Sequence, residues 1–287
     1  IIITANSASN TYDGTPLTDA GYTYTQNVLA SGDVLTATVE GTITDAGSTA
    51  NVVTGYVVMR GDTDVTANYT FGTSVNGTLT VNQRNVTLTS ADASKAYDGT
   101  ALTNDTVTVG GDGFVAGKGA VYYVSGIQID AGSSANTFTY DLTEGTLAEN
   151  YNITTTEGTL TVTPNTNTIV ITAGSDSKTY DGTPLTNSSY TYTEGVLAAG
   201  DVLTATVAGT ITNAGTAANN VTSYQVLRNG VDVTGNYTFG ESVPGTLTVN
   251  PKAVTLTSAS SSKVYDGTAL TNGKVTAEGF VGSYGAA

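Results

Sequence analysis

The chain has 287 residues and contains no Cys, His or Trp. These three absences exclude thiol nucleophiles, disulfides, His-ligated metals and a Ser-His-Asp triad. Nine Lys and Arg residues against 24 Asp and Glu give a net charge of −15, which disfavours nucleic acid and anionic membranes as partners, because both require clustered cations. Carboxylate-based catalysis and calcium binding by carboxylates remain chemically open.

The polar surface of this protein must come mainly from Thr. Only 11% of the residues are charged, whereas 57 are Thr and 34 are Gly. Thr is β-branched and polar, so it suits the solvent face of a strand, and the composition predicts an all-β, non-enzymatic protein. No apolar run approaches the roughly 18 residues of a membrane helix. The chain opens at Ile1 with neither Met nor a signal peptide, and we therefore expect it to be part of a longer polypeptide. The absence of Cys fits an extracellular bacterial protein that does not rely on disulfides.

Three short motifs recur along the chain and define internal repeats. The tetrapeptide Tyr-Asp-Gly-Thr, called the marker below, is followed in each complete repeat by Asn-Tyr and then by a closing Gly-Thr-Leu-Thr-Val. Residues 1–82 align with 169–250 without a gap and match at 58 of 82 positions. The repeats alternate between two types. The predicted boundaries are 1–82 (type A), 83–166 (type B), 167–250 (type A) and 251–287 (an incomplete type B).

Each complete repeat is long enough to bury a small core of its own. Solenoid repeats are usually 20–45 residues long and share a core with their neighbours, so the sequence favours an elongated tandem array of small modules, like beads on a string. At 82–83 and 250–251, almost no linker residues separate one repeat from the next. The polar segment 164–168 is longer, and we expect it to be a linker with more bending.

Alternation of apolar residues with Thr predicts the strands at both ends of each repeat. The first strands are expected at 1–5, 86–90, 169–173 and 254–258, and the last strands at 77–81, 158–162 and 245–249. Middle strands are expected at 34–39 and 202–207. At most one helical turn is expected, near 28–31 or 48–51. Asp45, Asp130 and Asn213 each begin a short turn ending in Ala-Gly.

The marker is the most specific feature, and we interpret it as a turn in which Asp and Gly shape the backbone while Tyr packs beneath. Its residues are Tyr12, Asp13 and Gly14; Tyr97, Asp98 and Gly99; Tyr180, Asp181 and Gly182; and Tyr265, Asp266 and Gly267. The alternative is a calcium site at each joint with the marker Asp as one ligand, although known calcium-loop spacings are absent. Lys95, Lys178 and Lys263 precede three of the markers, and a crosslink between such a Lys and an Asn is a further alternative.

Two further candidate functions rest on residue types alone. Paired carboxylates can hydrolyse glycosides, but no pair here stands out in a cleft-forming context. Tyr22, Tyr24, Tyr190 and Tyr192 place aromatic rings on one strand face, which could stack on a sugar or a protein. The alternative is that these rings are simply half-buried in a small β domain.

The motif set resembles the tandem YDG/MBG ("mostly beta-grasp") repeats of large bacterial surface proteins. The resemblance rests on "KTYDGTPLT" at 178–186, followed by "NYTF" and "GTLTVN". The type B repeats depart from it, with Ala101 and Ala269 where type A has Pro. The resemblance implies a β-grasp-like fold and no catalytic residues. It also implies that the first and last strands lie side by side and parallel, here residues 1–5 against 78–81.

We therefore expect a non-enzymatic stalk region of an extracellular bacterial adhesin or fibre, which projects a distal domain and bears load, without a cofactor. One alternative is the subunit of a filament completed by strand exchange between chains. This reading arises because residues 251–287 hold only the opening strands of a repeat. Another alternative is an adhesive module for host glycan or protein. The expected partners are neighbouring repeats of the same chain and, in the alternatives, identical chains or a host molecule.

Overall fold

The computed structural model describes residues 1–282, and within that range all regular structure is β apart from three one-turn 3₁₀ helices. The described residues form two compact units. The first comprises 1–93, 102–127 and 133–160; the second comprises 94–101, 128–132 and the chain from 161 onward. The boundary between the units thus runs through the first type B repeat. The coarse prediction of an all-β protein is confirmed.

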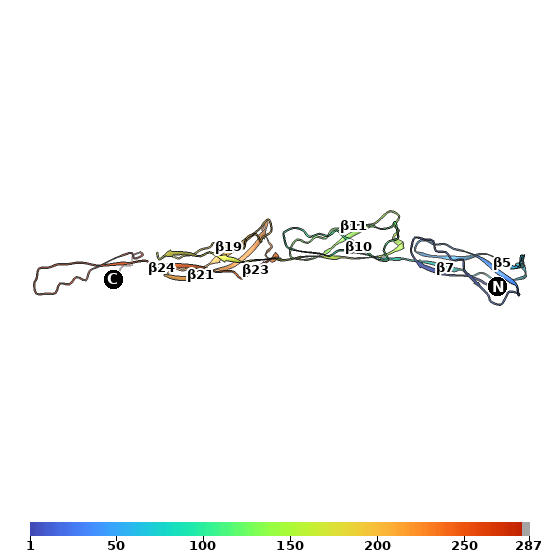
Figure 1. Ribbon diagram of the computed structural model, residues 1–287, viewed down its shortest axis with the longest axis horizontal. Helices are drawn as coiled ribbons and strands as arrows, with labels where there is room; N and C mark the ends of the chain where they lie inside the picture. Colours follow the sequence, from blue (N-terminus) through green and yellow to red (C-terminus); the bar gives the residue numbers. More distant parts are fainter. Residues whose placement is uncertain (283–287) are drawn as a thin grey trace. The chain divides into compact units, whose positions relative to one another are not determined.

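The strands of the first type A repeat form a mixed sheet in the order β2-β7-β5-β4, with β6 added beside β5. This repeat is drawn in blue in Figure 1, where β5 and β7 are labelled. A separate antiparallel pair, β1 with β3, lies next to it. The elements are β1 (Ile3–Ala5), β2 (Ala8–Thr11), β3 (Tyr22–Tyr24), β4 (Asp33–Glu40), β5 (Gly47–Arg60), β6 (Thr63–Asp64), the 3₁₀ helix η1 (Thr66–Asn68) and β7 (Gly77–Asn82).

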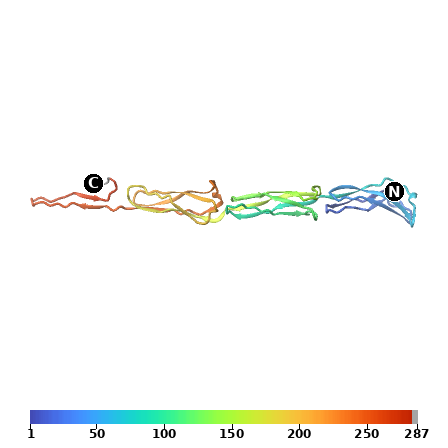
Figure 2. The ribbon, with the colours of Figure 1, turned by 90° about the horizontal axis from the view of Figure 1, so that it is seen from above.

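The second type A repeat, yellow to orange in Figure 2, has the same pairings, shifted by 168 residues, and in addition the pair β16-β23. Its long sheet runs β18-β24-β21-β20, with β22 beside β21. Its elements are β16 (Asn165–Ile169), β17 (Ile171–Ala173), β18 (Asp176–Thr179), β19 (Tyr190–Tyr192), β20 (Asp201–Ala208), β21 (Gly215–Arg228), β22 (Val231–Asp232), η3 (Thr234–Asn236), β23 (Tyr237–Phe239) and β24 (Gly245–Asn250). The two copies therefore serve as internal controls for one another.

The type B sequence forms two three-stranded sheets, ordered β10-β8-β14 and β12-β15-β9, and a β11-β13 pair. Its elements are β8 (Arg84–Ser90), β9 (Ala93–Ala96), β10 (Val107–Gly111), β11 (Ala120–Val124), β12 (Gly132–Asn136), β13 (Phe138–Leu142), η2 (Ala148–Asn150), β14 (Tyr151–Thr156) and β15 (Gly158–Thr163). Residues 251–282 contain only the antiparallel pair β25 (Thr255–Ser258) and β26 (Val275–Glu278).

The core comes from the alternating apolar positions that the sequence predicts at the strand ends. Ile3 and Ala5 in β1, and Leu79 and Val81 in β7, are all buried, as are their counterparts in the later complete repeats. Thr occupies the positions between them and covers the outer face. The prediction is wrong for the last copy, where Val254 and Leu256 are 41% and 61% exposed, because no further strand of the described chain covers them.

The parallel pairing of the first and last strands is present, but in a different register from the expected one. Residues of β2 rather than 1–5 pair with β7, with Ala8 opposite Leu79 and Thr11 opposite Asn82. Ile3–Ala5 instead run parallel to the segment around Val75, which exchanges backbone hydrogen bonds with Ile3 and Ala5. A bend between β1 and β2 therefore lets one N-terminal segment contact two different stretches.

Two smaller expectations are wrong. The single helical turns lie at the Asn-Tyr motifs, as η1, η2 and η3, whereas residues 48–51 belong to β5. The expected linker at 164–168 is largely the strand β16, which pairs in parallel with β23. Asn165 also donates its amide to the carbonyls of Tyr97 and Val196, so polar side chains at this joint hold the backbone.

Candidate functional site at the marker turns and repeat joints

Each Tyr-Asp-Gly-Thr marker is closed by its own Asp. Oδ1 of Asp98 accepts hydrogen bonds from the backbone N–H and the hydroxyl of Thr100, at 2.8 and 2.7 Å. The Gly between them has a φ of +81°, and the other three marker glycines have values of +79° or +80°. A side chain rarely tolerates this conformation, so the third marker position requires Gly.

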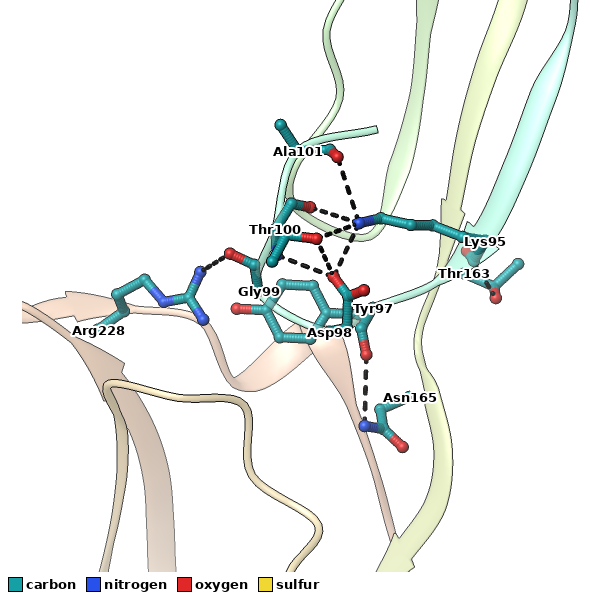
Figure 3. Close-up of polar contacts among 9 residues, drawn as sticks. All are labelled: Lys95, Tyr97, Asp98, Gly99, Thr100, Ala101, Thr163, Asn165 and Arg228. Atoms are coloured by element: carbon teal, nitrogen blue, oxygen red, sulfur yellow. Dashed lines mark hydrogen bonds and ion pairs between the residues drawn. The ribbon is translucent and has the colours of Figure 1, made fainter. Parts of the chain in front are cut away.

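A Lys two residues before the marker Tyr caps three of the four turns (Figure 3). Nζ of Lys95 donates to Oδ1 of Asp98 at 2.8 Å, and to the carbonyl and hydroxyl of Thr100 at 2.7 Å each. Lys178 makes the equivalent bonds to Asp181 and Thr183, and Lys263 donates to the carboxylate of Asp266, the hydroxyl of Thr268 and the carbonyl of Ala269. The three Lys amines thus donate hydrogen bonds to Asp and Thr of the marker turns. The crosslink hypothesis requires each amine to face the side-chain amide of an Asn instead.

The capping Lys changes the acidity of the marker carboxylates. Its hydrogen bond holds the pKa of Asp98 and of Asp181 well below the ordinary range. The same contact from Lys263 lowers the pKa of Asp266 to about 2. The first marker has Asn10 in place of Lys, and there the pKa of Asp13 is lowered chiefly by the hydroxyl of Thr15. All four Asp carboxylates are therefore held in their charged form.

Beyond the first two turns, the marker Tyr enters a joint with the Asn-Tyr motif of the following repeat. In the first unit, Tyr12 is buried and contacts Tyr151 edge-to-face, with ring centroids 5.5 Å apart. Asn150, itself fully buried, donates to Oδ1 of Asp45 at 2.8 Å and accepts from the backbone N–H of Ala46 at 2.6 Å. This set, called the first joint below, links both sequence motifs with the Asp-Ala-Gly turn.

The second unit repeats this geometry at what we call the second joint. Tyr97 and Tyr237 contact edge-to-face at 5.4 Å. Asn236 donates to Oδ1 of Asp130 at 2.8 Å, and the N–H of Ala131 donates to Asn236 at 2.6 Å. Two joints between different repeat types therefore use the same aromatic pair and the same Asn clamp. The clamp satisfies buried polar groups, and the rings supply apolar area.

The second joint adds a charged cluster that the first one lacks. Oδ2 of Asp201 accepts hydrogen bonds from the hydroxyls of Tyr97 and Tyr237, at 3.0 and 2.5 Å. Oδ1 of the same carboxylate accepts from Nε of Arg228 at 2.6 Å. Burial raises the pKa of both tyrosines, and the neighbouring Asp201 carboxylate reinforces the rise at Tyr237.

Arg228 connects this cluster to the marker turn (Figure 3). Its Nη1 donates to the carbonyl of Gly99 at 2.8 Å, and its guanidinium carbon lies 5.4 Å from the centroid of the Tyr97 ring. A Cβ at Gly99 would collide with the guanidinium and approach Cβ of Ala198 to 3.0 Å. The marker Gly is thus required twice, for its backbone conformation and for the close approach of Arg228.

The first type A repeat carries the same cluster without a marker turn against it. Arg60 donates to Oδ1 of Asp33 at 2.5 Å, and Tyr69 donates to Oδ2 at 2.6 Å. The Arg60 side chain is 56% exposed, whereas that of Arg228 is 21% exposed. The cluster therefore forms within a type A repeat by itself, and the marker turn covers it at the second joint.

The marker, the Asn-Tyr motif and the Asp-Ala-Gly turn are all recognisable in the sequence. Their contact with one another in the folded chain was not predicted. Asp201 and Arg228 were missed entirely, because neither belongs to a motif shared by all repeats. A buried Asn in each complete repeat was also missed: Asn51, Asn136 and Asn219. Each donates its amide to two loop carbonyls, those of Gly174 and Asn187 in the case of Asn219. The signal available was their recurrence four residues after each Ala-Gly turn.

The remaining sequence candidates lie as follows. Tyr22 and Tyr24 are half-buried and pack against the cluster of Ile3, Leu35 and Val58, and the hydroxyl of Tyr22 donates to the carbonyl of Leu35. Within residues 1–282, no three Asp or Glu side chains gather closely enough to hold a metal ion. The same range contains no helix with the length and apolar character needed to cross a membrane.

Comparison with known proteins adds little to this geometry. No protein-family model matches the chain. No curated protein matches it. Among solved structures, the chain is similar to an endo-fucoidan hydrolase of glycoside hydrolase family 107, with 13% identity and a TM-score of 0.19, over 84% of this chain and 42% of that one. The chain thus spans less than half of that protein, and the TM-score is too low to support any argument about fold or activity.

Proposed function

We propose that this chain is a non-enzymatic structural region of an extracellular bacterial surface protein, an adhesin or fibre, whose work is to project a distal domain and bear load. The observation that carries the proposal is the parallel pairing of β2 with β7 and of β18 with β24. In both type A repeats, a strand from the opening part of the repeat lies beside the strand that closes it.

This arrangement decides how the repeat responds to tension. In a parallel pair, the entering end of the first strand and the leaving end of the last strand lie at opposite ends of the shared ladder. Tension along the chain then loads the ladder hydrogen bonds together in shear. Forced unfolding depends on the unfolding rate, so such a ladder prolongs lifetime under load without requiring high equilibrium stability.

The joints support the same role. At each of them, a side chain of one repeat is hydrogen-bonded to the backbone of another, as Asn150 is to Ala46 and Arg228 is to Gly99. Because these bonds are largely shielded from water, bending or separating the repeats exposes unpaired polar groups, which is costly. A spacer benefits from joints of this kind.

The test uses cysteine handles, which are unique because the chain has no native Cys. In a shear variant, Ile2→Cys with Asn82→Cys loads β2 against β7 along the ladder. In a matched variant, Thr11→Cys with Asn82→Cys loads two residues that lie opposite one another in the register, so the ladder opens one bond at a time. Single-molecule pulling is expected to give a clearly higher rupture force for the shear variant. Equal forces would contradict the proposal.

A further inference from the structure

The complete type B repeat has an open strand edge at a place where both type A repeats are protected. Its strand β11, labelled in Figure 1, pairs with β13 on one side. Among the described residues, no strand pairs with β11 on its other side. We propose that this edge is an interaction surface for a second copy of the same chain, and that the two β11 strands pair antiparallel about Tyr122.

The outer face of β11 is apolar where that of the type A repeats is polar. Val121 and Tyr123 on β11, and Ile127 just beyond it, are 49%, 53% and 53% exposed. The equivalent type A residues are all exposed Thr: Thr36, Thr38 and Thr42 in the first repeat, and Thr204, Thr206 and Thr210 in the second. Because Val121 and Tyr123 lie two residues apart on one strand, they form a continuous apolar strip, which is typical of an interaction surface.

The backbone of β11 directs polar groups toward the open side. At one end of the strand, the N–H of Thr143 donates to the carbonyl of Gly119. At the other end, the N–H of Ser125 donates to the carbonyl of Thr137. Bonded and non-bonded residues alternate along an antiparallel pair, so every second residue between these two bonds points away from β13. These outward residues are Ala120, Tyr122 and Val124.

In the type A repeats, a tyrosine hydroxyl caps the corresponding edge. Tyr22 donates to the carbonyl of Leu35 in β4 at 3.1 Å, and Tyr190 donates to the carbonyl of Leu203 in β20 at 3.4 Å. The type B residue that corresponds to Tyr22 is Val107, which has no hydroxyl to donate. The edge carbonyls of β11 therefore remain available to a partner strand, and an edge of this kind recruits one.

The sequence of β11 identifies a second copy as the partner. In an antiparallel pair centred on Tyr122, the outward residues of the two chains face one another, so that Tyr122 meets Tyr122 and Ala120 meets Val124. On the outer face, Val121 of one chain then lies beside Tyr123 of the other. Pairs of a β-branched and an aromatic side chain stabilise neighbouring strands. One register thus satisfies both the backbone and the outer face.

Electrostatics favour the type B edge for this pairing. No residue of β11 is charged, whereas β4 begins with Asp33 and ends with Glu40, so pairing two β4 strands in the same way brings acidic ends together. Asp141 of β13 lies opposite Val121, on the side away from the partner. Both β11 strands therefore separate the two Asp141 carboxylates. Each chain carries a net charge of −15, so salt is expected to strengthen the association.

Cysteine cross-linking tests the register, because the chain has no native Cys. A tagged full-length chain with Val121→Cys is mixed with an untagged chain with Tyr123→Cys in a glutathione redox buffer. The proposed register places these two positions in a non-hydrogen-bonded pair, where Cα atoms are close enough for a disulfide. Mixed dimers are therefore expected to exceed the half of all dimers that random pairing gives. Thr204→Cys with Thr206→Cys, at the equivalent positions of β20, is the matched pair and should show no such excess.

Sedimentation equilibrium tests the association without cross-linking. The average mass of the full chain is expected to rise with protein concentration, and to rise more at high salt than at low salt. Tyr123→Glu is expected to abolish the rise, because it places a charge beside Val121 of the partner. Thr206→Glu, at the equivalent exposed position of β20, is expected to leave the rise unchanged. Amide exchange at Tyr122 is expected to slow by about tenfold or more in the dimer, since its N–H becomes bonded.

The proposal is overturned if the chain stays monomeric, if mixed disulfides do not exceed their random share, or if the two Glu variants associate alike. It is also overturned if the amide of Tyr122 exchanges equally fast in monomer and dimer, because the contact then lies elsewhere than at the edge of β11. This pairing does not depend on load bearing. A chain that resists force can remain monomeric, so failure here is distinguishable from failure of the proposed function.

Discussion

Tyr97 donates a hydrogen bond to Oδ2 of Asp201 at 3.0 Å, although 104 residues separate them in sequence. The bond joins a type B marker to a carboxylate of the following type A repeat, and the Tyr97 side chain is 1% exposed. Its counterpart Tyr265, in an otherwise similar turn, is 93% exposed. One sequence motif thus serves as a joint in one place and is exposed in the other.

Tyr97→Phe is expected to lower the free energy of unfolding of the second unit by about 1–2 kcal/mol, since a buried hydrogen bond to a charged group is lost. Urea unfolding followed by backbone amide signals of that unit measures the change. Tyr265→Phe is the matched control and should leave stability within about 0.5 kcal/mol. A comparable loss in both variants would contradict the role assigned to the joint.

Gly99→Ala and Gly267→Ala separate the two requirements on the marker Gly. Both positions have a φ near +80°, so each substitution costs roughly 1–2 kcal/mol of backbone strain. A Cβ at Gly267 meets no atom within 4 Å, whereas one at Gly99 meets Arg228 and Ala198. Gly99→Ala is therefore expected to destabilise the chain clearly more in thermal unfolding. Equal effects would mean that Arg228 moves aside without cost.

The sequence predicted the parts of the fold that depend on local pattern. Period-two alternation located the buried faces at Ile3 and Leu79, because a strand with one dry face must alternate. It could not supply register, because β2 reads Ala-Ser-Asn-Thr and lacks the alternation of apolar residues with Thr that marks β1, so nothing in the sequence identifies β2 as the strand that pairs with β7. The candidate site was predictable as motifs but not as a joint. Tyr97 and Asp201 come together through pairing between repeats, which no local pattern records.

Acid is expected to destabilise the marker turns, because folding lowers the pKa of their Asp carboxyls. The carboxyl of Asp181 has a folded pKa below its ordinary value of 3.8, owing first to Lys178. Its contribution to stability is therefore present above pH 3.8 and is lost as the pH falls toward the folded pKa. Lys178→Met should raise the pKa of Asp181 toward that of Asp13, which has no Lys partner. A carboxyl NMR titration measures this, and an unchanged pKa would exclude Lys178 as its cause.

The buried Asn of each complete repeat should be among the least tolerant positions. Asn219 is fully buried, and its amide donates to the carbonyls of Gly174 and Asn187 at 2.8 Å each. Asn219→Asp replaces the donor with a carboxylate that faces two carbonyl oxygens, so we expect a loss of about 3 kcal/mol or more in urea unfolding at neutral pH. The adjacent Asn220→Asp adds the same charge at an exposed position of β21 and should cost less than about 0.5 kcal/mol. If both variants unfold alike, net charge rather than the buried amide decides the outcome, and Asn219 does not anchor the two loops.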